Sequence, residues 1–270
     1  MLKDMTLGQY YPVDSMVHRL DPRTKLAGTL LYIISLFITN NVVGYAIAFL
    51  FLCLCIGLSH VPPKYILKGL KPVLVLMFIS VFFNLFFIKG EPVLFSWKFI
   101  TITQPGLRQA ILMAVRLVFL ISGSALMTYT TTPTALTDGM EKGLGFLKVF
   151  KVPVHEIAMM MSIALRFIPI LAEEADKIQK AQMARGAVFD EGNLIQRAKA
   201  LVPLLVPLFI SAFRRATDLA MAMEARCYHG GDGRTKMHPL KYGRNDMLVY
   251  TAFLVYLALV FISRKISIGI

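Results

Sequence analysis

Two short triplets contain the residues best placed to do chemistry: Ala184-Arg185-Gly186 and Ala225-Arg226-Cys227. Each ends a run of helix-forming residues and precedes a turn-prone stretch, so both arginines are expected at helix ends. An arginine there can simply face the negative end of the helix macrodipole. Because its neighbours are small, each guanidinium could instead enter a groove on another protein and bind a carboxylate bidentately. The presence of two copies favours docking, and we predict that all six residues belong to docking sites.

The composition is that of a membrane protein. Of the 270 residues, 56% are hydrophobic and 17% are charged, against about 25% charged residues in a typical soluble domain. The net charge of +13 could indicate nucleic-acid binding, but basic loops and anionic lipid give membrane proteins the same excess. We therefore predict a multi-pass protein of the cell membrane that contacts the lipid bilayer and no nucleic acid. Its cysteines, Cys53, Cys55 and Cys227, form no disulfide or metal-ligand pattern.

The first 25 residues are polar and lack the apolar core of a cleavable signal peptide. We expect them on the cytosolic side. Within the run from His18 to Lys25, the pair Asp21-Pro22 favours a helix start, with aspartate as the cap and proline in the first turn. The same pair could serve as an anchor at the membrane surface.

Five membrane spans are expected. Residues 26–59 carry no charge, yet one helix of that length would measure about 50 Å, against a hydrocarbon core of about 30 Å. The chain is therefore expected to reverse at Asn40-Asn41. Basic residues at 64–71 indicate a cytosolic loop, and sparse charge at 89–104 indicates an external one. The predicted spans are 25–39, 42–58, 72–88, 107–131 and 247–263.

Arg116 lies well inside the predicted span 107–131. A charged residue at membrane depth is a functional candidate by default. Alternatively, the side chain reaches the interface or faces the protein from a tilted helix. No acidic residue lies inside any predicted span to complete a proton or ion relay, and this favours the structural alternative.

Residues 132–245 differ from the spans, with 16 basic and 11 acidic residues and a charge of about +5. We predict a cytosolic domain of long amphipathic coupling helices between a membrane domain at 1–131 and a final span within 246–270. Apolar residues at helical spacing mark helices at 154–172, from Glu173 to the first triplet, and at 194–225, where Pro203 and Pro207 should cause a kink. The fold class is thus all-α.

Motifs for catalysis or cofactor binding are missing from the sequence. There is no glycine-rich phosphate loop, so the chain is not expected to bind ATP itself. His155-Glu156 lacks the second histidine of a zinc helix, and no serine or cysteine has a nucleophile-elbow context. We predict no catalytic, cofactor or metal site and a chain that is not an enzyme.

The chain resembles the transmembrane T component of energy-coupling factor (ECF) transporters, which are bacterial and archaeal importers of vitamins and metal ions. The resemblance covers nearly the whole chain. It rests on residues 18–26 as an N-terminal signature, on the early spans, on the coupling helices and on the paired triplets. The second triplet departs from the common Ala-Arg-Gly pattern at Cys227, which puts only the helix-cap geometry in question.

The resemblance implies that Arg185 and Arg226 each fit a groove of one of two ABC-type ATPase subunits, which bind the ATP. It also implies a separate membrane-embedded substrate-binding S component, which the coupling helices contact during vitamin or micronutrient uptake. The chain itself would be a scaffold and coupling subunit. A self-sufficient permease is the alternative, and it would need polar residues inside its spans. An intramembrane enzyme is a third interpretation.

Overall fold

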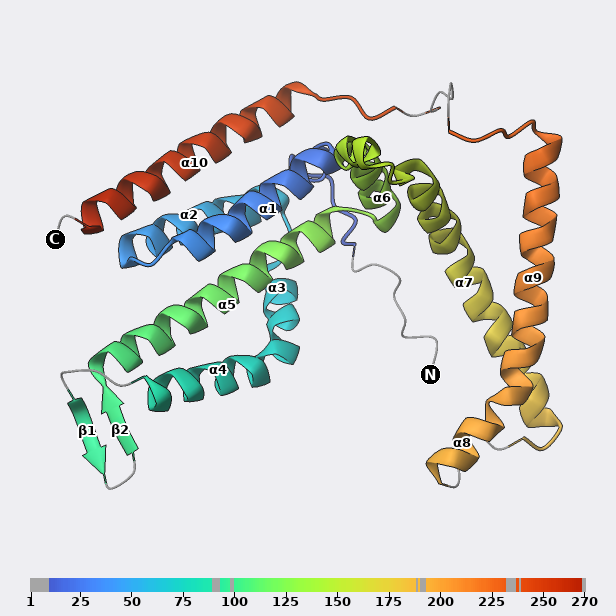
Figure 1. Ribbon diagram of the computed structural model, residues 1–270, viewed down its shortest axis with the longest axis horizontal. Coiled ribbons are helices and arrows are strands. Elements are labelled where there is room, and N and C mark those ends of the chain that lie inside the picture. Colours follow the sequence, from blue (N-terminus) through green and yellow to red (C-terminus); the bar gives the residue numbers. More distant parts are fainter. Residues whose placement is uncertain are drawn as a thin grey trace. The chain divides into compact units, whose positions relative to one another are not determined.

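The computed structural model describes residues 10–88, 93–97, 100–187, 189, 193–231, 237 and 239–268. Over these residues all regular secondary structure is helical except for one hairpin, which confirms the all-α fold class (Figure 1). Two compact units are present. Residues 8–139 and 240–270 form one, called here the membrane unit, and residues 140–239 belong to the other, called here the coupling unit.

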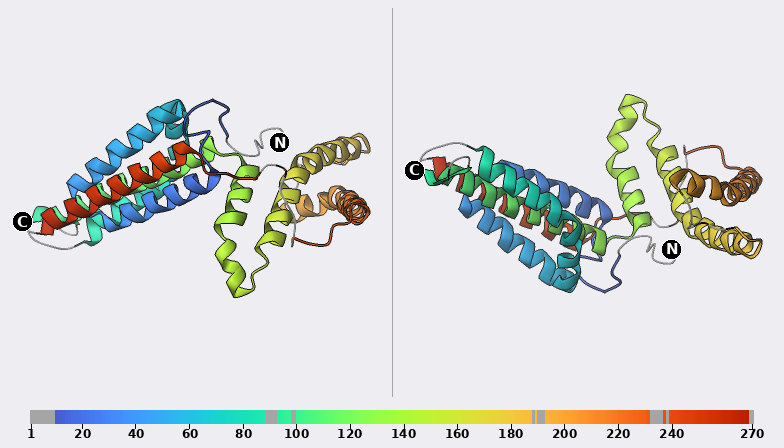
Figure 2. Two further views of the ribbon diagram at one scale, coloured as in Figure 1. Left: turned by 90° about the horizontal axis from the view of Figure 1, so that it is seen from above. Right: turned by 90° about the horizontal axis from the view of Figure 1, so that it is seen from below.

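The membrane unit is built on four long helices: α1 (Pro22–Ile38), α2 (Val42–Ser59), α5 (Gln104–Thr130) and α10 (Arg244–Ile268). They lie side by side in the views of Figure 2. Their shared core consists of aromatic and aliphatic side chains that recur every three or four residues, on one face of each helix: Tyr32, Leu36, Tyr45, Ala48, Leu52, Phe119, Tyr256 and Val260.

The predicted helix start at Asp21-Pro22 and the predicted reversal of the chain at Asn40-Asn41 are both confirmed. The Asp21 carboxylate accepts the backbone N–H of Arg23 and caps α1, with Pro22 in the first turn. At the expected reversal, Asn41 caps α2 by accepting the N–H of Gly44. The Asn41 amide also donates to the carbonyl of Ser263 at 2.8 Å, so this turn is tied to the far part of α10.

The predicted loop after α2 is not irregular, because the chain there folds into α3 (Pro63–Leu70). Its cytosolic location stays a prediction. Pro63 stands in the first turn, where its missing N–H costs nothing, and the lysines occupy the polar side of a short amphipathic helix. The 3-10 turn η1 (Lys71–Val73) then leads into α4 (Leu74–Phe87).

The predicted external loop at 89–104 contains an antiparallel hairpin of β1 (Val93–Trp97) and β2 (Ile100–Thr103). Val93 pairs with Thr103, and Trp97 pairs with Ile100. The β-branched residues of Ile100–Thr103 favour a strand, a preference that a reading based on charge alone misses. Residues 89–92, 98 and 99 of this predicted loop lie outside the described residues.

The coupling unit contains η2 (Gly145–Phe150), α7 (Val154–Ala184), α8 (Leu194–Ala200) and α9 (Val202–Ala225), after α6 (Pro133–Gly143), which joins the two units. The predicted break before Glu173 is wrong, because α7 continues for 31 residues and holds Pro169 inside it. The residues after Ala172 are themselves good helix formers. The predicted interruption near Pro203 is confirmed, since the chain breaks at Leu201 between α8 and α9. At Pro207 there is no break, because α9 continues through this residue.

Five helical stretches of the described residues are long and apolar enough to cross a membrane: Val42–Ser59, Pro63–Phe87, Gln104–Thr130, Val154–Ala184 and Arg244–Lys265. The number of these stretches equals the number of predicted spans, but the two sets do not contain the same helices. It includes α7, which we assigned to the cytosol, and it omits α1, which has 17 residues. Length and composition therefore admit α7 as a span, and its cytosolic location stays a prediction.

Candidate docking site

Both triplets stand at the C-terminal ends of helices, as predicted. Arg185 is the C-cap of α7, with φ −90° and ψ 7°, and Arg226 is the C-cap of α9, with φ −96° and ψ 14°. The two arginines thus have nearly the same backbone conformation. They lie on two helices that pack against each other within the coupling unit.

The hydrogen bonds that close the two helix ends are also the same. After α7, the N–H of Gly186 donates to the Met183 carbonyl at 2.9 Å and that of Ala187 to the Gln182 carbonyl at 3.0 Å. After α9, Cys227 donates to Glu224 at 2.9 Å and Tyr228 to Met223 at 3.0 Å. These paired bonds define the Schellman motif, which satisfies carbonyls that a helix end otherwise leaves unbonded.

The third residue of each triplet has a left-handed backbone. Gly186 has φ +88° and Cys227 has φ +55°. Glycine adopts this conformation without steric cost, whereas a cysteine does so at roughly 1–2 kcal/mol. The Schellman motif nevertheless forms at Cys227. The departure from the Ala-Arg-Gly pattern therefore leaves the cap geometry unchanged.

All six triplet residues are exposed. No described carboxylate lies within 4.0 Å of the guanidinium of Arg185 or Arg226. Arg215, also on α9, contrasts with them, because it donates to Glu174 of α7 at 2.7 Å and so fixes these helices together. Each triplet arginine keeps its donors available for an external acceptor such as a carboxylate.

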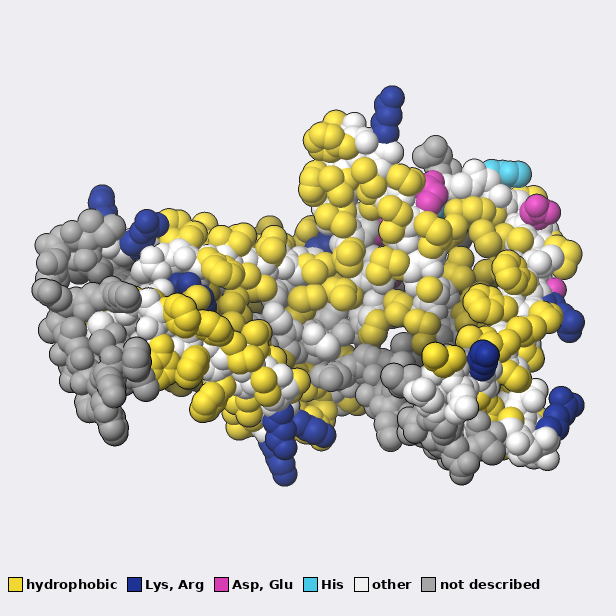
Figure 3. Space-filling model, turned by 60° about the horizontal axis from the view of Figure 1, so that its bottom comes forward, with side chains coloured by type: hydrophobic (Ala, Val, Ile, Leu, Met, Phe, Trp, Pro, Cys, Tyr) yellow, Lys and Arg dark blue, Asp and Glu magenta, His cyan; other side chains and the backbone are white. Residues whose placement is uncertain are grey.

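Apolar side chains cover much of the remaining surface of α7 and α9. Exposed examples on α7 are Ile157, Met160, Met161 and Ile168, and on α9 they are Phe209, Ile210, Phe213 and Met221. Figure 3 shows hydrophobic side chains spread widely over one face of the molecule. A surface of this kind suits contact with another apolar surface, either lipid or a membrane protein.

Arg116 is held by protein groups. Its Nε donates to the Tyr45 hydroxyl at 2.9 Å, and its Nη2 donates to the Thr39 carbonyl at 3.0 Å and to Asn40 Oδ1 at 3.1 Å. The cation thus sits at the C-terminal end of α1, where it faces the negative end of the macrodipole. This geometry agrees with the structural interpretation of Arg116.

The N-terminal signature is a polar cluster at one end of the membrane unit. Lys25 Nζ donates to the carbonyls of His18 at 3.0 Å and Thr130 at 2.8 Å. Asp21 pairs with Arg23 at 2.8 Å, and its N–H donates to Asp246 Oδ1 at 2.9 Å. Sequence reasoning missed Asp246, a buried carboxylate at the start of α10, because no local signal links positions so far apart.

Within the described residues, no group of three or more His, Cys, Asp or Glu side chains is arranged to hold a metal ion. His155 has one acidic partner, Glu141, at 2.9 Å. His238 lies outside the described residues.

Taken together, the five apolar helical stretches and the second helical unit are those of a polytopic membrane protein. Comparison with known proteins identifies the family. Residues 14–238 match the CbiQ family, described as cobalt transport protein, and the chain therefore belongs to this family, as the transmembrane component of an energy-coupling factor transporter.

Similar proteins named energy-coupling factor transporter transmembrane protein EcfT occur in several bacteria. The one from Clostridium kluyveri is 54% identical over 265 residues, which is 98% of each chain. Those from Ruminiclostridium cellulolyticum and Bacillus subtilis are 52% and 48% identical, each over 98% of this chain. The resemblance inferred from the triplets and the signature is thereby confirmed.

Proposed function

We propose that this chain is the non-catalytic coupling subunit of an ECF-type ABC importer. Arg185 and Arg226 each dock one ATPase subunit, and α7 and α9 pass the motion driven by ATP hydrolysis to a membrane-embedded S component that binds the vitamin or micronutrient. The observation that carries the proposal is that two exposed arginines occupy the same position of the same helix-cap motif.

The repeated cap supports two equivalent partners. A Schellman motif fixes the backbone on both sides of the arginine, so each guanidinium is presented from a preorganised helix end. Because the caps at Arg185 and Arg226 have the same geometry, they suit two ATPase subunits that share one fold. A role limited to compensating the macrodipole would need neither full exposure nor small residues on both sides.

The connections of the coupling unit support its location on one side of the membrane. The start of α1 contacts both the end of α5, through Lys25 and Thr130, and the start of α10, through Asp21 and Asp246. The chain therefore leaves and rejoins the membrane unit at the same end. If α7 crossed the membrane, α9 would have to return through it.

Such a return would place charged residues of α9 at membrane depth: Arg214, Arg215 and Asp218. The cost of burying them argues against a crossing. We therefore place residues 140–239 outside the bilayer, and the excess of basic residues at 132–245 supports the cytosol as that side. The start of α1 then lies on the cytosolic side as well.

The exposed apolar residues of α7 and α9 provide the contact with the S component in this proposal. Several are methionines, whose flexible and polarisable side chains adapt to more than one partner surface. A self-sufficient permease is less well supported, because Arg116, the charged residue well inside a span, is already bound by Tyr45, Thr39 and Asn40.

Co-purification of the ATPase subunits with single and double arginine variants tests the proposal. Arg185→Ala and Arg226→Ala should each weaken the complex, since truncating one member of a buried charge pair typically costs about 2–5 kcal/mol. The double variant should lose both ATPases and ATP-driven uptake. Lysine at either position should restore little, because it lacks the bidentate fork.

Matched controls are Arg166→Ala on α7 and Arg214→Ala on α9, which remove an exposed arginine from the same helices outside the triplets. Both should retain the ATPases at equal membrane expression. Assembly of the double variant at the wild-type level would refute docking through these arginines.

A further inference from the structure

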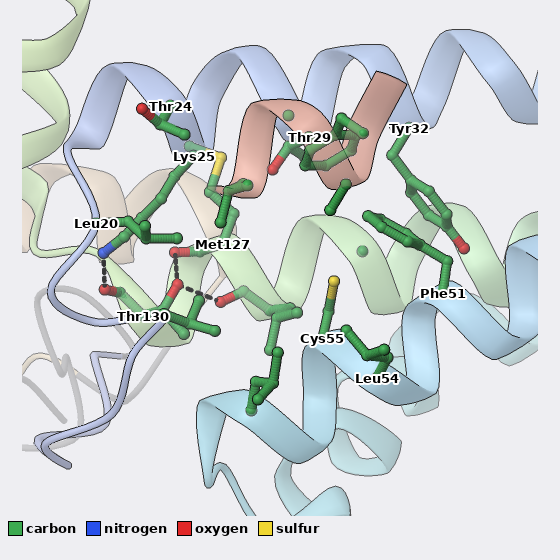
Figure 4. Close-up of a pocket in the computed structure, with 18 of the residues that line it drawn as sticks. Leu20, Thr24, Lys25, Thr29, Tyr32, Phe51, Leu54, Cys55, Met127 and Thr130 are labelled. Carbon is green, nitrogen blue, oxygen red and sulfur yellow. Dashed lines mark hydrogen bonds between the residues drawn. The ribbon is translucent and has the colours of Figure 1, made fainter. Parts of the chain in front are cut away.

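The membrane unit contains an apolar cavity of about 290 Å³ among α1, α2, α5 and α10. Thr29 on α1 and Cys55 on α2 reach into it from opposite sides, and Tyr32 and Phe51 close one end (Figure 4). A cavity of about 150 Å³ lined by apolar side chains stays free of water and binds apolar molecules. This larger cavity should therefore hold an apolar group.

The cavity continues along the protein surface into a groove between α2 and α10. The groove has a volume of about 490 Å³ and shares Phe51, Leu54, Leu248 and Ala252 with the cavity. From Leu248 to Leu259, the α10 residues that line this path span about 16 Å along the helix, at 1.5 Å per residue. That length is about half of the hydrocarbon core of about 30 Å, which is the depth of one leaflet.

Lys25 is the one charged residue among those that line the cavity, and it lies at the edge next to Thr130 (Figure 4). An ammonium group has three N–H donors, and those of Lys25 bind two carbonyls, of His18 and Thr130. Among the described residues, no carboxylate forms an ion pair with Lys25 within 4.0 Å. Asp21 is paired with Arg23, and Asp246 accepts the N–H groups of Asp21 and Gly243. One donor remains for an anion.

An apolar path one leaflet deep with a cation at its end matches a lipid that has an acyl chain and an anionic headgroup. We propose that this cavity binds an anionic phospholipid of the surrounding membrane, with one acyl chain in the cavity and groove and the headgroup phosphate at Lys25. A free fatty acid shares this chemistry, but the phospholipid is the occupant that the bilayer supplies at this depth.

The test measures lipid binding to the purified full-length chain by native mass spectrometry, with phosphatidylglycerol, phosphatidylcholine and palmitate as probes. Wild-type chain should bind phosphatidylglycerol in preference to both others. Cys55→Phe should fill the cavity and weaken this binding at least about tenfold, which equals about 1.4 kcal/mol. Thr29→Phe fills the cavity from the opposite wall and should act alike, so the test does not depend on one variant folding.

Cys53→Phe is the matched control, because Cys53 lies on the same helix but is exposed and does not line the cavity. It should bind phosphatidylglycerol as the wild type does. Lys25→Gln should remove the preference for phosphatidylglycerol over phosphatidylcholine. Equal binding by wild type, Cys55→Phe and Thr29→Phe would refute the site. Wild-type preference for phosphatidylcholine or for palmitate would refute the anionic phospholipid.

Discussion

Replacing Gly186 by alanine isolates the contribution of the helix-cap conformation to docking. A Cβ added at Gly186 would meet no atom within 4 Å, so the substitution causes no clash. Its cost is confined to the backbone, which has φ +88°. A left-handed conformation costs a non-glycine residue roughly 1–2 kcal/mol, and this free energy corresponds to a decrease in ATPase affinity of about 5- to 30-fold.

The assay is binding of the purified ATPase subunits to the full chain in lipid nanodiscs. Gly186→Asn should lose less affinity than Gly186→Ala, because asparagine tolerates the left-handed region better. Cys227→Gly should bind at least as tightly as the wild type, since it removes the strain present at Cys227. Gly143→Ala is the control for loss of a glycine, because its Cβ also meets nothing and its φ is not positive.

Unchanged affinity in Gly186→Ala, with Arg185→Ala strongly impaired, would contradict the reasoning. It would mean that the guanidinium matters but that the Schellman motif does not position it. A loss of affinity in Gly143→Ala equal to that in Gly186→Ala would equally show that the left-handed backbone is not the cause.

Two further predictions concern the membrane unit. Arg116→Leu removes the hydrogen bonds to Tyr45, Thr39 and Asn40. It should lower the free energy of unfolding, measured by denaturation in detergent, by at least about 1.5–3 kcal/mol, the value of one hydrogen bond to a charged group. Unchanged stability with lost uptake would instead make Arg116 functional. Burial lowers the pKa of His18 below its usual 6.5, so the unfolded chain binds more protons than the folded chain. The free energy of unfolding should therefore decrease as pH falls below about 6.5. In His18→Gln this decrease should be smaller over the same range, and an identical pH dependence of stability in both proteins would contradict the prediction.

The features that could be predicted from the sequence are local ones. Asp21 and Asn41 cap their helices through side-chain bonds to residues two or three positions away, and such contacts leave a signal in neighbouring residue types. The same holds for the triplets, where a small residue after arginine marks a helix end. Cys227 shows that glycine is not required for the motif to form.

The features that could not be predicted depend on contacts distant in sequence or on helix preferences that charge obscures. The contact of Asp21 with Asp246 joins residues separated by 225 positions, and the partners of Arg116 come from the end of α1 and from α2. The lysines of α3 and the acidic residues after Ala172 were interpreted by charge, although they also favour helix. Tertiary contacts therefore explain the first pair of features, and local helix preference explains α3 and the length of α7.

Labelling of the native Cys227 thiol with a membrane-impermeant maleimide tests docking and orientation together. Cys227 is exposed and adjacent to Arg226, and in a Cys53→Ser, Cys55→Ser background it is the single reactive thiol of the chain. The account predicts that Cys227 is labelled only from the cytosolic side and that bound ATPase subunits protect it, with protection lost in Arg226→Ala. Labelling from outside the cell, or at the same rate with and without the ATPases, would contradict it.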